Sequence, residues 1–352
     1  MISSPTSASA QKKSLASRLI GFIIPLVITV GLCWLLFHDI DMKHMWDIIR
    51  HECDFFWIGL NLCLSVCAQI WRALRWQIQL KAIGVRPTLW QLILSIFGTY
   101  SVNLVFPRLG EVWRTGYISE RTRSSFTEVF GSMVAERLSD TIAVALFMLA
   151  TLIASGSQLK EYLAQDPEKF ASISSILTSP ILWGAVIATL VAVWWIFTRY
   201  PENKVIAFVR RVWRGLWIGF SAIWKMPGKC LWLFYTVLLW GSYFMGLYCA
   251  FRSFPLTSQV LDIYGMQALL VCYVFTSIAM AVPSNGGIGP WQWAMIFGLS
   301  FYTAKVPDLT TDYANSFANL VMGTQTLLQI LLGIFTFAWI AIVKRTEKSA
   351  KI

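Results

Sequence analysis

The sequence has little charge for its length. Only 13% of its 352 residues are charged, whereas an ordinary soluble domain has about 25%. At the same time, 57% of the residues are hydrophobic. A chain this apolar cannot cover itself with a water-facing surface. The composition therefore excludes an ordinary soluble protein and predicts an all-α integral membrane protein, because helices satisfy their own backbone hydrogen bonds in lipid.

Motifs for catalysis and metal binding are also missing. His38, His44 and His51 fall in one loop without metal-ligand spacing. Cys63 and Cys67 share a helix face, but their segment holds no His, so packing explains them better than a metal does. The sequence contains neither a Walker phosphate loop nor a Gly-x-Ser-x-Gly turn. We therefore expect no metal, no cofactor and no enzymatic activity.

The net charge of +11 does not indicate a nucleic-acid partner. Its basic residues lie in the termini and in short loops between apolar segments, which is typical of residues that orient a membrane protein. A nucleic-acid-binding surface would instead gather them in a stripe or patch.

Apolar stretches of about 20 residues predict membrane-spanning helices. Two other stretches, 89–106 and 263–304, are tested by counting Lys and Arg. If both return to their own side, the two sides carry 22 and six Lys/Arg; a full crossing by 89–106 gives 11 inside and 17 outside. The positive-inside rule favours re-entry with both termini cytoplasmic, in the inner membrane. The six predicted spans are 19–37, 55–71, 128–154, 181–198, 229–251 and 315–343.

The stretch 263–304 is long enough for a deep hairpin or for two tilted spans. Its turn contains no charge, which favours shelter within the protein. The chain then divides into halves 15–155 and 180–345, each with two spans, a hairpin and a span. The halves have opposite orientation, so we expect an inverted repeat with two oppositely oriented re-entrant hairpins. The predicted domains are a cytoplasmic tail at 1–18, a transmembrane domain at 19–343 and a second tail at 344–352.

The first hairpin turns at a Pro-x-x-Gly break. Pro107 cannot continue a helical hydrogen-bond ladder, and Gly110 permits a sharp turn. Glu111 and Arg114 are three residues apart, so they can pair across one helical turn. Arg108 is then either free to meet an anion or an ordinary cytoplasmic charge.

The second hairpin repeats this Pro-x-x-Gly spacing. Its glycines remove side chains just before a helix that we expect to begin near Pro290, since proline suits the first helical turn. The unpaired N–H groups of that turn can hold an anion. The predicted turn residues are Pro283, Ser284, Asn285, Gly286, Gly287 and Gly289.

Three charged residues lie inside the predicted span 128–154: Glu136, Arg137 and Asp140. Charges at that depth cost about 2.5–3.5 kcal/mol each, so they mark a pathway or a clamp to a neighbouring helix. Arg72 and Arg75 follow the second span, where an interfacial anchor is favoured over a headgroup contact.

The last predicted span also carries polar residues at a spacing of four. They either line a polar path or bond helices together. They are Asn315, Asn319, Gln325 and Gln329.

Five motifs in order resemble the lysylphosphatidylglycerol synthase transmembrane-region, or flippase-like, family over nearly the whole chain. The resemblance implies a membrane half that moves aminoacylated phosphatidylglycerol between leaflets, without the soluble domain that transfers the aminoacyl group. The motif Pro290-Trp291 stands where a carboxylate is expected, which argues against proton coupling there. The motifs are Arg72-Ala-Leu-Arg75-Trp76, Tyr100-Ser-Val-Asn103, Pro107-Arg-Leu-Gly-Glu111 with Arg114, Glu136-Arg-Leu-Ser-Asp140 and Pro283-Ser-Asn-Gly-Gly-Ile-Gly289.

We therefore expect a transporter of an anionic membrane phospholipid or a polyprenyl-phosphate-linked lipid. One alternative is a glycosyltransferase that uses a polyprenyl-phosphate sugar and a loop carboxylate, and another is a scaffold for a separate lipid-modifying enzyme. A homo-oligomer is a further expected partner state. The expected headgroup-binding residues are Arg72, Arg75, Arg108, Glu111, Arg114 and Arg137, and the expected pathway residues are Asn103, Glu136 and Asp140. The loop carboxylates are Asp39, Asp41, Asp47 and Asp54.

Overall fold

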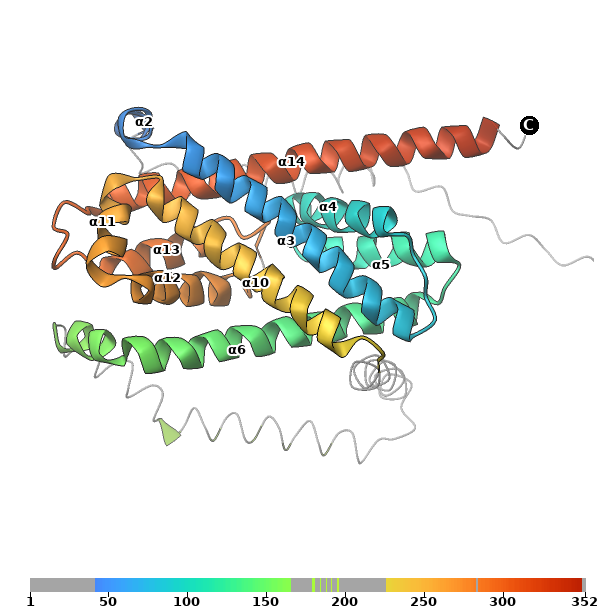
Figure 1. The fold of residues 1–352 in the computed structure, drawn as a ribbon, viewed down its shortest axis with the longest axis horizontal. Coiled ribbons are helices and arrows are strands. Elements are labelled where there is room, and N and C mark those ends of the chain that lie inside the picture. The colour runs from blue at the N-terminus through green and yellow to red at the C-terminus, as the bar shows by residue number, and fades with distance from the viewer. Residues whose placement is uncertain are drawn as a thin grey trace, which may run out of the picture. The chain divides into compact units, whose positions relative to one another are not determined.

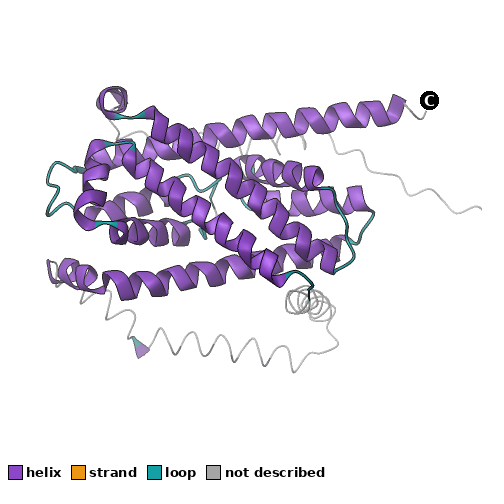
Figure 2. Cartoon of the chain, viewed as in Figure 1, coloured by secondary structure: helices purple, strands orange, loops and turns teal. Residues whose placement is uncertain are grey.

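The computed structural model describes residues 42–165, 179–180, 226–282 and 284–349, with the single positions 184, 188, 191 and 195. Within these residues every regular element is an α-helix (Figure 2). The predicted tail 1–18, the span 19–37, nearly all of the span 181–198, and Pro283 lie outside the described residues.

The helices of the first half follow one another closely. Asp54 caps the second of them by accepting a hydrogen bond from the Phe56 amide at 2.9 Å. Thr88 and Gln91 form a reciprocal capping box at the start of the third, with bonds of 3.2 and 3.0 Å. The helices are α2 (Met42–Glu52), α3 (Phe55–Ala82), α4 (Leu89–Val105), α5 (Leu109–Thr122) and α6 (Phe126–Gln165).

The described helices of the second half use proline at two starts. Pro255 and Pro290 occupy first-turn positions, where the missing N–H costs no hydrogen bond. Before Pro290, Gly286, Gly287 and Gly289 have φ values of 65°, 92° and 93°, which glycine adopts without strain. The helices are α10 (Lys229–Arg252), α11 (Pro255–Tyr264), α12 (Met266–Ala279), α13 (Pro290–Ser300) and α14 (Thr311–Ser349).

Among the described residues, three helices are long and apolar enough to cross a membrane: α3, α10 and the part of α14 from Thr311 to Val343. They contain the predicted spans 55–71, 229–251 and 315–343. The pair α11 and α12 is bent by 115° and adds a fourth crossing if it acts as one broken span. The predicted span 128–154 lies within α6, which is 40 residues long and carries several charges.

The paired helices of the two hairpins are short. The helices α4 and α5 have 17 and 14 residues and pack against each other, as do α12 and α13 with 14 and 11 residues. At 1.5 Å per residue, the longest of them covers about 25 Å, less than the ~30 Å of a hydrocarbon core. The stretch 263–304 is therefore two short helices joined by a turn.

The helices α3 and α10 lie side by side and run in opposite directions (Figure 1). Asn61 contacts Gly246, Trp71 stacks on Tyr235 at 6.1 Å, and the N-terminal end of α10 reaches the C-terminal end of α3. The helices α6 and α14 also run in opposite directions (Figure 1).

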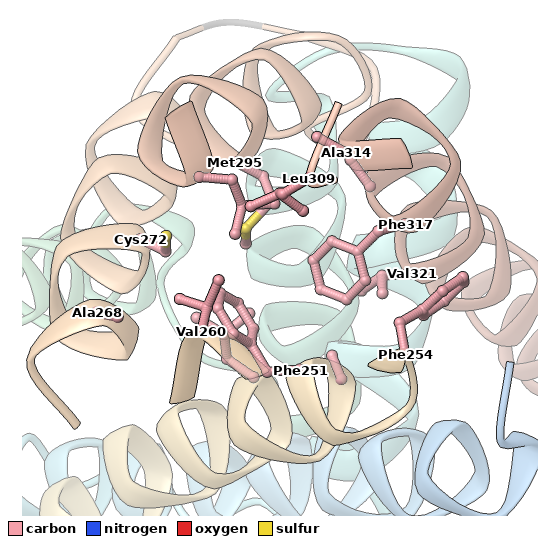
Figure 3. Close-up of a cluster of buried hydrophobic side chains, with 14 of the residues drawn as sticks. Phe251, Phe254, Val260, Ala268, Cys272, Met295, Leu309, Ala314, Phe317 and Val321 are labelled. Atoms are coloured by element: carbon pink, nitrogen blue, oxygen red, sulfur yellow. The ribbon is translucent and has the colours of Figure 1, made fainter. Parts of the chain in front are cut away.

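Each hairpin packs on the last helix of the other half, α4 on α14 and α12 on α6. The larger apolar core joins α10 to α14. In it, the rings of Phe251 and Phe254 pack edge-on against Phe317 at 5.4 and 5.6 Å (Figure 3). A second core surrounds the fully buried Trp76 and joins α3 to α6. The candidate site lies beside this second core.

Candidate functional site

Arg72 and Arg75 on α3 are almost completely buried, with 4% and 0% of their surface exposed. Their spacing of three puts both guanidinium groups on one helix face. This burial contradicts the favoured interpretation that they are interfacial anchors. This burial has no direct sign in the sequence, because arginines beside tryptophans at the end of an apolar stretch are equally typical of a helix end among lipid headgroups.

The buried acceptors for these arginines come from α6. Arg72 Nη1 lies 2.7 Å from Glu136 Oε1 and 2.8 Å from Asp140 Oδ2. Arg75 Nη2 lies 2.7 Å from Asp140 Oδ1 and 3.4 Å from Glu136 Oε1. Two arginines spaced three residues apart on α3 thus pair with two carboxylates spaced four residues apart on α6. These ion pairs join α3 to α6.

Arg114 adds a third buried cation from α5. Its Nη2 donates to Glu136 Oε2 at 2.9 Å, and its guanidinium lies 4.3 Å from the centre of the Trp76 ring. Trp76 is itself held in place, because its Nε1 donates to Ser132 Oγ at 3.1 Å. The expected partner of Arg114 was Glu111; the structure pairs it with Glu136.

Glu111 pairs with Arg137, at 3.3 Å from Nη2. This pair is the most exposed of the site, with 35% of the Arg137 side chain accessible. Arg137 Nη1 also lies 3.8 Å from Asp140, as its spacing of three predicted. Asn103 supports the pair by donating to Glu111 at 3.3 Å and by accepting from the Gly110 amide at 2.8 Å.

Together these residues form what we call the arginine–carboxylate cluster. Four arginines face three carboxylates, so its formal charge is +1. Several buried guanidinium nitrogens make no hydrogen bond to a described residue: Nε of Arg72 and Arg137, and Nε and Nη1 of Arg75 and Arg114. Unbonded buried N–H groups are costly, so the cluster has both the charge and the free donors to accept an anion.

The turns of the two hairpins contact each other. Arg108 was expected to be either free to meet an anion or an ordinary cytoplasmic charge; in the structure its Nη2 donates to the Met280 and Ala281 carbonyls at 3.1 and 2.6 Å. Met280 is the C-cap of α12 and Ala281 follows it, so the cation lies at a helix C-terminus, where it is favourable. On the other side, Gly286 lies so close to Leu104 that an added Cβ would come within 2.5 Å of its methyl group. The exposed Arg108, with φ 64°, therefore bridges the two hairpins.

The second half places neutral residues where the first half has charges. Gln292 is the third residue of α13, as Glu111 is of α5. Gln292 donates to Asn319 of α14 at 2.7 Å, whereas Glu111 pairs with Arg137 of α6. Gln292 is thus a neutral residue near the place where a carboxylate was expected.

Polar residues of α14 bond helices together. The Gln325 side chain accepts from Ser65 of α3 at 2.9 Å. Gln329 accepts from Ser101 of α4 at 2.6 Å only through its backbone carbonyl, and its side-chain Oε1 is buried without a partner among the described residues. With the Gln292–Asn319 bond, these contacts favour helix association over an open polar path for the described residues.

The described residues contain no group of three His, Cys, Asp or Glu side chains that could hold a metal. Burial and then the neighbouring Asp54 raise the pKa of the Cys53 thiol to about 11, so it is a poor nucleophile at neutral pH. Asp54 itself caps α3, while Asp39 and Asp41 lie outside the described residues.

The apolar helices, paired short helices and buried charges define a multi-helix membrane protein. The family described as Lysylphosphatidylglycerol synthase TM region matches residues 22–333, and the chain belongs to this family. Comparisons with curated proteins and with solved structures gave no match.

Proposed function

We propose that this protein moves an anionic or phosphate-linked lipid between the leaflets of the inner membrane and catalyses no reaction. The observation that carries the proposal is the arginine–carboxylate cluster, with its formal charge of +1 and the unbonded guanidinium N–H groups of Arg72, Arg114 and Arg137. Arginine suits this task because its planar, permanently charged group binds phosphate through several N–H donors. Family membership supports a role connected with membrane lipids.

The proposed architecture is an inverted repeat with six spans, two re-entrant hairpins and cytoplasmic termini. It is supported by the opposite directions of α3 and α10, the short paired helices, and the contact between the two breaks. In such repeats, broken helices form the substrate site near the middle of the membrane. The Glu111–Arg137 pair is the accessible edge of the cluster, so we expect the headgroup to enter there.

The test uses purified protein in liposomes with labelled anionic lipids, and it measures how fast inner-leaflet headgroups become accessible. Arg137→Gln removes the accessible cation and lowers the cluster charge to zero. Because one charge-assisted bond is worth about 1.5–3 kcal/mol, we expect transport at low lipid concentration to fall about tenfold or more.

Arg252→Gln is the matched control. Arg252 also forms a partly exposed pair, with Asp262 at 2.8 Å, but it lies at the far end of α10 from the cluster. We expect it to transport like the wild type. If the wild type moves no lipid from an anionic panel, even with ion gradients, the proposal fails and the enzyme and scaffold alternatives take its place.

A further inference from the structure

Arg75 has two sides, and the arginine–carboxylate cluster uses only one of them. Its Nη2 binds Asp140 and Glu136, while its Nε and Nη1 are buried and unbonded within the described structure. The guanidinium carbon lies 5.8 Å from the centre of the Trp232 ring on α10. The donors on this second side therefore face the boundary between α3 and α10.

Other unbonded polar atoms lie on α3 and α10 near Arg75. Gln79 follows Arg75 by one helical turn on the same face, is 3% exposed, and has no bond on either Nε2 or Oε1. The Nε1 of Trp232 is also buried and unbonded. These polar groups lose their hydrogen bonds to water when they are buried. They gain none in the described structure, which is energetically costly.

The first turn of α10 lies near this part of α3. Its N-cap is Gly228, which has no side chain to cap the helix and lies beside Ile78 of α3. Helix N-termini carry free amide groups and a partial positive charge, both of which favour anions. Lys229, at the first helical position, adds a full positive charge.

We propose that Arg75, Gln79, Trp232 and the first turn of α10 form a phosphate-binding site at the end of the α3–α10 pair. The site shares Arg75 with the arginine–carboxylate cluster but includes none of its carboxylates, and its donors come from Arg75, Gln79 Nε2, Trp232 Nε1 and the first turn of α10. A phosphate group suits it because it has several acceptor oxygens and one or two negative charges. The positive-inside count puts these ends of α3 and α10 on the cytoplasmic side, so the phosphate comes either from solution or from an inner-leaflet headgroup.

Because α3 and α10 come from opposite halves, a phosphate here contacts both halves at once. The site does not depend on lipid transport, and its test does not measure transport.

The experiment uses the full chain in discs of phosphatidylcholine and measures binding of radiolabelled inorganic phosphate by equilibrium dialysis. Gln79→Leu and Trp232→Phe each remove unbonded polar atoms but leave every ion pair of the cluster in place. We expect each to weaken phosphate binding about tenfold or more, the usual effect of losing one hydrogen bond to a charged group. Trp240→Phe is the control, since Trp240 Nε1 is also buried and unbonded but is two turns further along α10.

A second arm replaces phosphate with discs that contain phosphatidylglycerol and measures the unfolding midpoint. If only this lipid stabilises the wild type, and the stabilisation is lost in Gln79→Leu and Trp232→Phe but kept in Trp240→Phe, the phosphate is that of a lipid. Without ligand, Gln79→Leu should unfold at the same temperature as the wild type or higher, because an unbonded buried amide is removed. No binding in either arm, or binding that the two variants leave unchanged, overturns the proposal.

Discussion

Glu136 is the acceptor on which three buried arginines converge. Its two oxygens lie within 3.4 Å of Arg72, Arg75 and Arg114, and its side chain has no exposed surface. Attraction to three cations offsets the cost of burying one carboxylate, and no other carboxylate of the cluster touches both α3 and α5. Glu136 therefore has a structural role, whichever ligand the cluster binds.

Glu136→Gln tests this role. The neutral amide leaves three buried cations against one remaining carboxylate, and removing one partner from a buried ion pair costs about 3–5 kcal/mol. We expect a much lower thermal unfolding midpoint in detergent. Glu128→Gln, on the exposed first turn of the same helix, should change stability by less than about 0.5 kcal/mol. Equal midpoints for the two variants would show that Glu136 is not a structural hub.

At the scale of the helix, contacts between residues of one helix could be predicted from the sequence better than contacts between helices. The polar spacing in α6 correctly predicted that Arg137 approaches Asp140. It could not predict that Arg114 pairs with Glu136, because this contact depends on how α5 packs against α6 rather than on spacing within one helix. The carbonyl contacts of Arg108 could not be predicted for the same reason, since its acceptors lie 172 and 173 positions away.

The first hairpin depends on close packing at Gly110. A Cβ there would lie 2.7 Å from Asn103 Oδ1 and even closer to the Thr99 carbonyl on α4. Gly110→Ala must push the two helices apart, and overpacking of this kind costs about 1–3 kcal/mol. We expect a lower unfolding midpoint and slower lipid movement, since Asn103 also supports Glu111.

Gly116→Ala gives the comparison within the same helix, because a Cβ at Gly116 meets nothing within 4 Å. Alanine is favoured over glycine in a helix by about 1 kcal/mol, so this variant should be as stable as the wild type or more so. If Gly110→Ala behaves in the same way, the hairpin does not require its close approach.

At the scale of the whole molecule, two matching helix contacts among the described residues differ in charge. Among the described helices, α4 packs on α14 and α12 packs on α6. The third residue of α5 and the third residue of α13 each make a polar contact with the long helix that follows. One half uses the Glu111–Arg137 pair and the other the neutral Gln292–Asn319 pair. Among the described residues, the buried arginine–carboxylate cluster therefore lies in the first half, and the corresponding contact of the second half is neutral, so we expect an anionic headgroup to be held in the first half.

Gln292→Glu tests this asymmetry by giving the second half the carboxylate that it lacks. Gln292 is 7% exposed, and a charge at such a site costs about 2.5–3.5 kcal/mol when it is unpaired. Adding Asn319→Lys supplies a counter-charge, so the double variant should recover much of that stability, as a double-mutant cycle measures. In liposomes the folded single variant should show a higher KM for an anionic lipid, because the added negative charge lies on the hairpin that Arg108 links to the first. The double variant, with that charge neutralised, should return toward the wild-type KM. An unchanged KM in the single variant would mean that the charge of the second half has no influence on the headgroup.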